Sequence, residues 1–320
     1  MNELRIISLI PSATETVYAL GLGKYLVGRS HDCDFPEQAK ELPVCSAPRF
    51  QSSGKSKEIN RAVEDILKEA VSIYNIDLEK IKELKPTHII TQSQCRVCAV
   101  STDEIERLLQ EYIRENPVKF IDLNPETLDH ALADFVKLST ALGHFDKGFK
   151  LRIAINKEMQ SISMKANMQG KNISVAVLEW MDPLMVAGHW MHDILELASV
   201  KNVFPKKEKK QKISFDELRE KDPEKIIIAP CGFEIKKTLQ ETPALRDNSG
   251  WKDLRAVKNS AVYLVDGSAY FNRPGPRLLD SLQILTEILY PGEFEKKHGE
   301  KDWIQINNSY NGKFHSIQSC

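Results

Sequence analysis

Short apolar runs of strand length alternate with amphipathic segments of helix length along most of the chain. In the first part of the chain, the spacing of the apolar positions predicts strands and helices in turn. The predicted strands are residues 4–10, 26–29 and 118–123, the predicted helices are residues 14–20 and 60–72, and a strand followed by a helix lies within residues 87–105. Because strands and helices alternate, we expect a mainly parallel sheet with its functional loops along one edge.

The pattern changes between residues 126 and 168, where apolar residues recur at helical spacing and no strand is predicted. Only Gly143 and Gly148 interrupt the repeat, so this stretch predicts one long helix or a pair of nearly continuous helices. After Gly170 the alternation returns. It predicts strands at residues 173–180, 225–229 and 261–265, and helices at residues 191–199, 215–220 and 278–290.

These elements define an α/β protein in which two lobes with mainly parallel sheets are joined by a long connecting helix. The chain has 320 residues, which suits two lobes of about 150 residues each. The expected parts are an N-terminal α/β lobe (1–125), a helical connector (126–169), a C-terminal α/β lobe (170–300) and a polar, loosely packed tail (301–320).

Composition and charge argue against several classes of partner. The hydrophobic content of 42%, the charged content of 28% and the net charge of -1 are ordinary for a globular protein. A nearly neutral chain gives no electrostatic sign of nucleic acid or an anionic membrane. The N-terminus lacks the basic region of a signal peptide, and no stretch of transmembrane length is present. We therefore expect a cytoplasmic protein with reduced thiols, and we do not expect an ABC permease as its partner.

A loop with two thiols follows the third predicted strand. Cys95 and Cys98 have CxxC spacing, and Ser101 with Glu104 has the spacing of a helix-capping box. The order is therefore strand, loop and helix. In an α/β protein such a loop lies at the carboxyl end of a strand, where ligands bind.

Four of the six cysteines come directly after predicted strands: Cys33, Cys95, Cys98 and Cys231. Their shared position predicts a common site, with His31 or His189 as a further ligand of zinc or another soft metal. An iron–sulfur cluster is a second possibility. However, CxxC occurs only once, and Cys33 and Cys231 also suit small buried positions at loop ends. Thiol–disulfide exchange is less favoured, because in redox enzymes the attacking cysteine begins the helix.

Two further loops carry aromatic and polar side chains. Trp180, His189 and Trp190 flank one loop and could cover a flat ligand by stacking, although a packed loop with one satisfied histidine explains them equally well.

The second of these loops contains Tyr270, Asn272 and Arg273. The guanidinium of Arg273 suits a ligand carboxylate or phosphate. The alternative is that Pro274 and Pro276 only shape the entry to the last helix.

Other motif-like segments do not indicate a function. The run Ser52-Ser53-Gly54-Lys55-Ser56 resembles the end of a P-loop, but Arg49 stands where the first glycine is required. The lysine-rich run at residues 206–212 is typical of a solvated loop. No serine nucleophile elbow is present.

Several motifs together resemble the helical-backbone metal-receptor superfamily, the class III substrate-binding proteins of ABC transporters. They are SLIPSATETVYALGLG (8–23), VGRSHDCDFP (27–36), IKELKPTHIITQSQCRVCAV (81–100), GHW (188–190) and AYFNRPGPRLLD (269–280). The match is closest to a cysteine-bearing branch that resembles the cobalamin-binding periplasmic proteins and often lacks a signal peptide. The resemblance implies two Rossmann-like lobes bridged by a long helix, with the ligand between them. It assigns no catalytic residue.

Two main hypotheses follow from these observations. The first is a soluble binding protein that holds a cobalamin-like or metal-chelate ligand in the cleft between the lobes. Its ligand-binding residues would be His31, Trp180, His189, Trp190, Tyr270, Asn272 and Arg273. The alternative is a cytosolic metal- or iron–sulfur-dependent protein or enzyme that uses the four strand-end cysteines. A binding protein is favoured over an enzyme, because no residue has a recognisable catalytic role.

Overall fold

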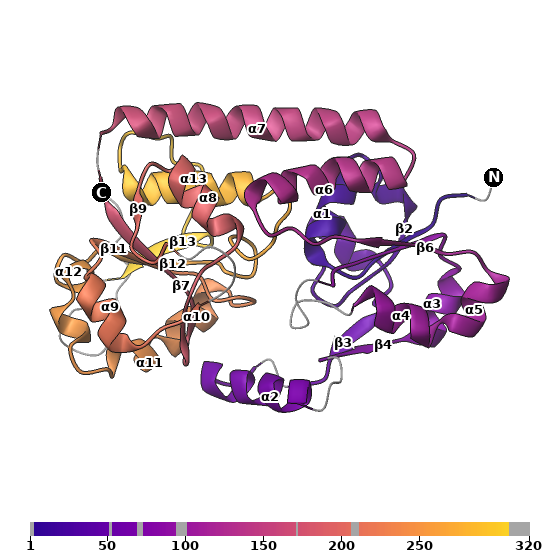
Figure 1. Ribbon diagram of the computed structural model, residues 1–320, viewed down its shortest axis with the longest axis horizontal. Helices are drawn as coiled ribbons and strands as arrows, with labels where there is room; N and C mark the ends of the chain where they lie inside the picture. Colours follow the sequence, from indigo (N-terminus) through magenta and orange to yellow (C-terminus); the bar gives the residue numbers. More distant parts are fainter. Residues whose placement is uncertain are drawn as a thin grey trace. The chain divides into compact units, whose positions relative to one another are not determined.

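The computed structural model describes residues 3–50, 53–68, 73–93, 101–170, 172–205 and 211–306. The chain divides into two compact units (Figure 1). The first comprises Met1–Gly54, Glu58–Pro125 and Asp129–Ile155, and the second comprises Lys55–Lys57, Glu126–Leu128 and Asn156–Cys320. The residues predicted as a separate connector, 126–169, are therefore shared between the two units.

A four-stranded parallel sheet forms the centre of the first unit. Its strands are β1 (Ile6–Ser8), β2 (Leu26–Arg29), β5 (His88–Thr91) and β6 (Lys119–Asp122), in the order β2-β1-β5-β6. All four were predicted from the apolar runs. Helix α1 (Pro11–Ala19) follows β1 almost directly, with a proline in its first turn, where the missing amide hydrogen costs nothing.

Shorter elements complete the first unit. They are η1 (Gly23–Tyr25), η2 (Glu37–Glu41), the antiparallel pair β3 (Ser46–Pro48) and β4 (Tyr74–Ile76), α2 (Ser56–Lys68), α3 (Leu78–Leu84), α4 (Thr102–Leu108) and α5 (Gln110–Glu115). The amphipathic pattern predicted α2 at residues 60–72, and the helix begins four residues earlier, at Ser56. The capping signature of Ser101 is confirmed, since its hydroxyl accepts a hydrogen bond from the Glu104 amide at 3.3 Å.

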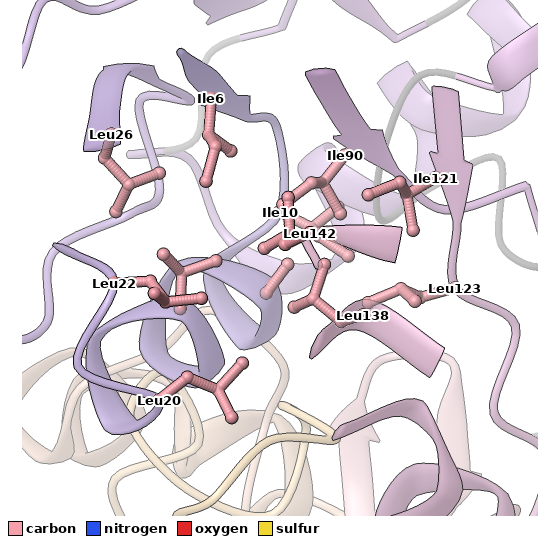
Figure 2. Close-up of a cluster of buried hydrophobic side chains, with 12 residues drawn as sticks. Ile6, Ile10, Leu20, Leu22, Leu26, Ile90, Ile121, Leu123, Leu138 and Leu142 are labelled. Atoms are coloured by element: carbon pink, nitrogen blue, oxygen red, sulfur yellow. The ribbon is translucent and has the colours of Figure 1, made fainter. Parts of the chain in front are cut away.

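The core of the first unit lies between its sheet and the helices α1 and α6 (Leu128–Ala141) (Figure 2). Strand and helix contribute side chains to one continuous cluster, which includes Ile6, Ile10, Ala13, Val17, Leu20, Leu22, Leu26, Ile90, Ile121, Leu123, Leu138 and Leu142. Burial of each large aliphatic side chain contributes about 1.5–3 kcal/mol before the entropy of ordering is subtracted. This cluster fixes the sheet, and therefore the loops at its edge.

The predicted helical stretch forms a pair of helices, α6 and α7 (Phe145–Met168), as one of the two alternatives stated. Gly143 separates them with a φ of +78°, a left-handed conformation that favours glycine. Gly148 lets α7 approach α6 closely, because a Cβ at this position would collide with the Ser139 hydroxyl and the Phe135 carbonyl. The two glycines that interrupt the pattern are therefore the turn and the contact point of the pair.

A mixed sheet with a parallel centre forms the core of the second unit. The strands β7 (Ser174–Met181), β11 (Lys225–Ile228) and β12 (Val262–Val265) are parallel neighbours, as predicted. The further strands are β8 (Leu184–Val186), β9 (Lys201–Asn202), β10 (Gln211–Lys212) and β13 (Trp303–Ile306), and the order of the main path is β10-β8-β7-β11-β12-β13. Antiparallel pairing of β8, β10 and β13 makes this sheet less regular than expected.

The helices of the second unit are α8 (Trp190–Leu197), α9 (Phe215–Lys221), α10 (Ile235–Glu241), α11 (Pro243–Arg246), η3 (Trp251–Asp253), α12 (Arg255–Lys258) and α13 (Leu278–Leu289). The long helix α13 is almost entirely buried, and the Tyr290 hydroxyl that follows it donates to the Ala198 carbonyl at 2.8 Å. No helix within the described ranges is both long and apolar enough to cross a membrane.

The prediction of a loosely packed tail after residue 300 is wrong for Trp303–Ile306. These residues form β13, which pairs in antiparallel register with β12. Ile306 and Asp302 are buried. Polar residues are common on an edge strand, so the polar composition of this stretch hid its place in the sheet.

Candidate functional site

Both units place loops at the carboxyl ends of parallel strands, where α/β proteins bind ligands. In the first unit, the loop after β2 carries His31 and Cys33, and the loop after β5 leads toward Cys95 and Cys98. In the second unit, Trp180 lies near the end of β7, and His189 and Trp190 follow β8. Cys231 follows β11, and the loop after β12 carries Tyr270, Asn272 and Arg273.

His31 is half-buried and held by neighbours within the first unit. Its Nδ1 lies 2.9 Å from the Ser46 hydroxyl, its Nε2 lies 3.4 Å from Asp32, and its ring packs at 5.2 Å from that of Tyr74. Burial lowers the pKa of His31, the Asp32 carboxylate opposes this change, and Arg29 adds to it. A neutral imidazole is the form that coordinates a metal or accepts a hydrogen bond from a ligand.

Cys33 is fully buried, and hydroxyl groups surround its thiol. The hydroxyl of Thr14 donates to Sγ at 3.0 Å, the Ser30 hydroxyl lies 3.1 Å from Sγ, and the Ser8 carbonyl lies 3.7 Å away. These contacts tie the loop after β2 to the end of β1 and to α1. They support the structural role for Cys33 that was one of the two alternatives.

Cys45, which was not predicted as a site residue, is also buried. Burial raises the pKa of its thiol to about 11. A thiol with a raised pKa is a weak nucleophile and a poor metal ligand at neutral pH.

Cys95 and Cys98 lie outside the described residues, so the structure does not test the CxxC loop. Residues on either side of it are described. The Ser93 hydroxyl accepts a hydrogen bond from the Thr102 amide at 3.2 Å, and the Ser93 amide donates to Asp122 at 2.8 Å. The end of β5 and the start of α4 are therefore held together next to β6.

In the second unit, hydrogen bonds connect the two loops that follow β11 and β12. The carbonyl of Phe233 accepts from the amides of Gly267 and Ser268, at 3.0 and 3.2 Å. The Asn272 amide group donates to the carbonyls of Ala229 and Gly267, at 3.0 and 2.9 Å. Asn272, predicted as a ligand-binding residue, thus uses its side-chain donor to hold the loops together.

Glycine at position 267 is required by this close approach of the loops. A Cβ at Gly267 would collide with the carbonyl of Pro230 and with the backbone of Ala229. The loops after β11 and β12 therefore form one surface, which we call the loop platform (residues 229–234 and 266–277).

Trp180 lies beside the loop platform, and Cys231 belongs to it. The Trp180 ring packs against Phe233 at 5.0 Å, and its indole nitrogen donates to the Asp182 carbonyl at 3.1 Å. The Cys231 amide donates to the Glu179 carbonyl at 3.3 Å, and the Cys231 side chain is half-buried. Both residues thus keep part of their side chains accessible.

His189 and Trp190 differ in what they can contact. His189 is half-buried and has a φ of +51°, an uncommon conformation for a residue with a side chain. Trp190 is buried, and its indole nitrogen donates to the Phe271 carbonyl at 2.7 Å. Trp190 therefore fixes the loop after β12, and only His189 of this pair is partly accessible. Their rings are stacked at 5.6 Å.

Tyr270 and Arg273 are half-buried residues of the loop platform. The Tyr270 hydroxyl donates to Asp302 at 3.0 Å, and Arg273 Nη2 lies 3.5 Å from the Ser268 hydroxyl. The sequence did not indicate Asp302 or Phe233 as part of this region. Their roles depend on contacts between residues more than thirty positions apart, which leave no local pattern.

No group of three or more metal-ligating side chains comes together within the described ranges. Of the four predicted cysteine ligands, Cys33 belongs to the first unit and Cys231 to the second, and the other two are not described. A zinc or iron–sulfur site on these thiols stays a hypothesis. The described geometry suits ligand binding, with aromatic rings, a guanidinium and an imidazole on connected loops.

Comparison with known proteins gives a consistent group of relatives. The chain is 23% identical over 298 residues to the "Uncharacterized ABC transporter substrate-binding lipoprotein YvrC" of Bacillus subtilis (strain 168), covering 91% of this chain and 82% of that protein. It is 26% identical over 291 residues to the "Vitamin B12-binding protein" of Vibrio cholerae serotype O1, covering 89% of this chain and 88% of that protein.

Solved structures show the same fold. The periplasmic vitamin B12-binding protein BtuF of Vibrio cholerae matches with a TM-score of 0.62 and 25% identity, over 89% of this chain and 96% of that one. The apo form of the periplasmic heme-binding protein RhuT from Roseiflexus sp. RS-1 matches with a TM-score of 0.66 and 22% identity, over 92% of this chain and 100% of that one. The second likeness shows the fold alone.

These relatives correct one prediction. The expectation of a cytoplasmic protein is wrong, because proteins that match along most of the chain are described as periplasmic or as a lipoprotein. They point to a location outside the cytoplasm. The relatives also agree with the expectation of a small ligand.

The model of the periplasmic binding protein family matches residues 6–269, which is most of the chain. This range includes the sheet of the first unit, the helix pair, and the loops after β7 and β11. The chain is a ligand-binding protein and belongs to the periplasmic binding protein family, within the superfamily of class III substrate-binding proteins.

Proposed function

We propose that this chain binds a cobalamin-like molecule or another metal chelate outside the cytoplasm and presents it to an ABC permease. The observation that carries this proposal is the loop platform, whose connected loops carry Cys231 and Arg273 and whose Phe233 packs against Trp180 at the end of β7. Relatives named for vitamin B12 and heme support a planar metal chelate. The named lipoprotein of an ABC transporter supports the permease.

The side chains suit the chemistry of such a ligand. An indole such as that of Trp180 packs against a flat macrocycle, and the guanidinium of Arg273 pairs with the carboxylate or phosphate groups that these ligands carry. His189 offers an imidazole, which suits the metal ions of such chelates. In the first unit, His31 offers an imidazole in the loop after β2.

Calorimetric titration tests the proposal with three probes: cyanocobalamin, hemin and a ferric hydroxamate chelate. We expect one of them to bind the wild type with measurable heat. Arg273→Ala removes a charged hydrogen-bonding group, so it should weaken this binding by about tenfold or more. Trp180→Ala should weaken it by a similar factor, because it removes the stacking surface.

The controls are Arg114→Ala and Phe145→Ala, which remove an exposed guanidinium and an exposed aromatic ring in the first unit. They should leave the affinity unchanged. If none of the three probes gives heat above the dilution background, the proposed ligand class is wrong. If the controls weaken binding as much as Arg273→Ala and Trp180→Ala do, the loop platform is not the binding surface.

A further inference from the structure

The segment after α13 returns to the sheet and contacts the loop platform. We call residues 297–306 the C-terminal strap. Its last part is β13, and the carbonyl of Asp302 accepts a hydrogen bond from the Asp266 amide at 2.9 Å. Asp266 is where β12 ends and the loop 266–277 begins. The strap thus reaches the base of the loop that carries Tyr270, Asn272 and Arg273.

Glu287 attaches the strap to α13. This carboxylate is buried, and three groups of the strap donate to it. They are the Lys297 amide at 2.9 Å, the His298 Nδ1 at 2.8 Å and the Trp303 indole at 3.0 Å. His298 is also buried, and its Nε2 lies 3.5 Å from Asp280. A buried carboxylate with three donors holds its neighbours in a defined geometry.

Asp302 attaches the strap to the loop. It is only 6% exposed, and its two carboxylate oxygens have different partners. Oδ1 accepts from the Tyr270 hydroxyl at 3.0 Å, and Oδ2 accepts from the Gly299 amide at 2.9 Å. The Tyr270 ring also meets the His298 ring edge-on at 6.0 Å. Tyr270 is therefore held by two residues of the strap.

Rigidity of the loop follows from this arrangement. Asn272 holds the loop to the end of β11, and Trp190 holds Phe271. Tyr270 precedes Phe271 and Asn272 in the loop, and its hydroxyl donates to Asp302 of the strap. The first residues of the loop have further backbone bonds, from the Gly267 and Ser268 amides to the Phe233 carbonyl, and a turn in which the Asp266 carboxylate accepts from the amides of Ser268 and Ala269. The hydrogen bond of the Tyr270 side chain is made to the strap.

We infer that the C-terminal strap positions the ligand-binding loop, with Asp302 and Glu287 acting as positioning residues through Tyr270. This inference rests on the proposed function of the loop. It extends that function to residues that do not touch the ligand. Holding a binding loop in one conformation raises affinity because less ordering is required when the ligand binds.

Two variants test the strap in the ligand-free protein by amide hydrogen exchange. Asp302→Asn leaves one acceptor oxygen where the Tyr270 hydroxyl and the Gly299 amide use two, and Tyr270→Phe removes only the hydroxyl. Both should speed exchange within residues 266–277 by about tenfold, while exchange in β7 and β11 stays unchanged. Glu293→Gln, an exposed substitution after α13, is the control and should leave exchange unaltered.

Binding of the probe chelate gives the second measurement. Asp302→Asn should weaken it by about tenfold. If the strap acts through the Tyr270 hydroxyl, the double variant Asp302→Asn with Tyr270→Phe should bind no more weakly than Tyr270→Phe alone. If the two residues act independently, the two losses of affinity should multiply.

The possible failures are distinguishable. If the wild type binds none of the probes, the proposed function fails, and the exchange measurement alone decides the strap. If exchange in the loop is unchanged, or rises equally throughout the second unit, the strap does not position the loop. If the probe binds normally to Asp302→Asn, the inference is also overturned.

Discussion

Glu287 and His298 form a buried pair whose pKa shifts have opposite directions. Burial alone would lower the pKa of His298, but hydrogen bonds and charges from Asp280 and Glu287 raise it to about 9. Burial alone would raise the pKa of Glu287, but hydrogen bonds from His298, the Lys297 amide and Trp303 lower it. Both residues are therefore charged in the folded protein at neutral pH.

The sign of the pH dependence follows from these directions. Because the pKa of His298 is raised, protonation of this residue stabilises the folded state. The contribution is complete below pH 6.5, the ordinary histidine pKa, and it is lost as the pH rises through about 9. The charged Glu287 carboxylate, whose pKa is lowered, contributes stability above pH 4.5, its ordinary pKa, and this contribution is lost in acid. The pair therefore stabilises the second unit most between these two ordinary values.

We predict that raising the pH from about 6 to about 9.5 lowers the free energy of unfolding of the second unit, and that His298→Gln removes much of this decrease. All four tryptophans lie in the second unit, so their fluorescence during denaturant unfolding reports on it. Glu293→Gln is the exposed control and should behave like the wild type. If raising the pH lowers the stability of His298→Gln as much as that of the wild type, His298 is not the group responsible for the pH dependence.

Asp134 on α6 has a buried carboxylate oxygen, Oδ2, with no hydrogen-bond partner. Burial raises the pKa of Asp134 to about 6, although Lys137 and His130 oppose the change. Because the folded protein holds the proton more tightly than the unfolded chain does, stability falls as the pH rises from 3.8 toward 6.

Asp134→Asn should therefore increase the free energy of unfolding of the first unit at pH 7.5, on the order of 1 kcal/mol. Thermal unfolding at pH 7.5 and at pH 4.5 measures the effect, which should shrink at the lower pH. Glu106→Gln, an exposed substitution on α4, should change neither value. A loss of stability at pH 7.5 would show that the charged carboxylate has a stabilising partner.

At the scale of elements, the apolar spacing predicted the central strands of both sheets and the long helices. These elements are buried, so their pattern is set by the core. It missed β3, β4, β8, β9, β10 and β13. These short strands depend on pairing with a neighbour more than on their own residues, so their sequences carry little signal.

Gly148 provides a test of the contact between α6 and α7. Alanine favours a helix over glycine by about 1 kcal/mol, but its Cβ would collide with Ser139 and Phe135. We predict that the collision wins, and that Gly148→Ala lowers the free energy of unfolding by about 1–3 kcal/mol. Lys150→Ala, on an exposed position of the same helix, should be nearly neutral. If Gly148→Ala is instead stabilising in chemical denaturation, the two helices do not pack as described.

The candidate site was only partly accessible from the sequence. Strand ends placed Cys33, Trp180, Cys231 and Arg273 at the correct edges of their sheets. The roles of individual side chains were less predictable. Trp190 is buried against Phe271, and Cys33 is enclosed by hydroxyl groups, because partners far along the chain fold onto them.

At the scale of the whole molecule, the motifs identified the superfamily correctly, and the family match over residues 6–269 confirms it. The location was predicted wrongly. That prediction depended on the lack of a signal-peptide pattern and of a transmembrane stretch, whereas the comparison with a lipoprotein and a periplasmic protein depends on similarity along most of the chain. The motifs reflect the fold and its loops, and the compartment is not encoded in them.

The central claim is that the loop platform, at the carboxyl ends of β11 and β12, binds a metal chelate. Amide hydrogen exchange, measured with and without a saturating amount of the chelate that gives heat of binding, tests it most directly. The account predicts slower exchange in residues 229–234 and 266–277 on binding. A chelate that binds without slowing exchange in either segment would contradict it.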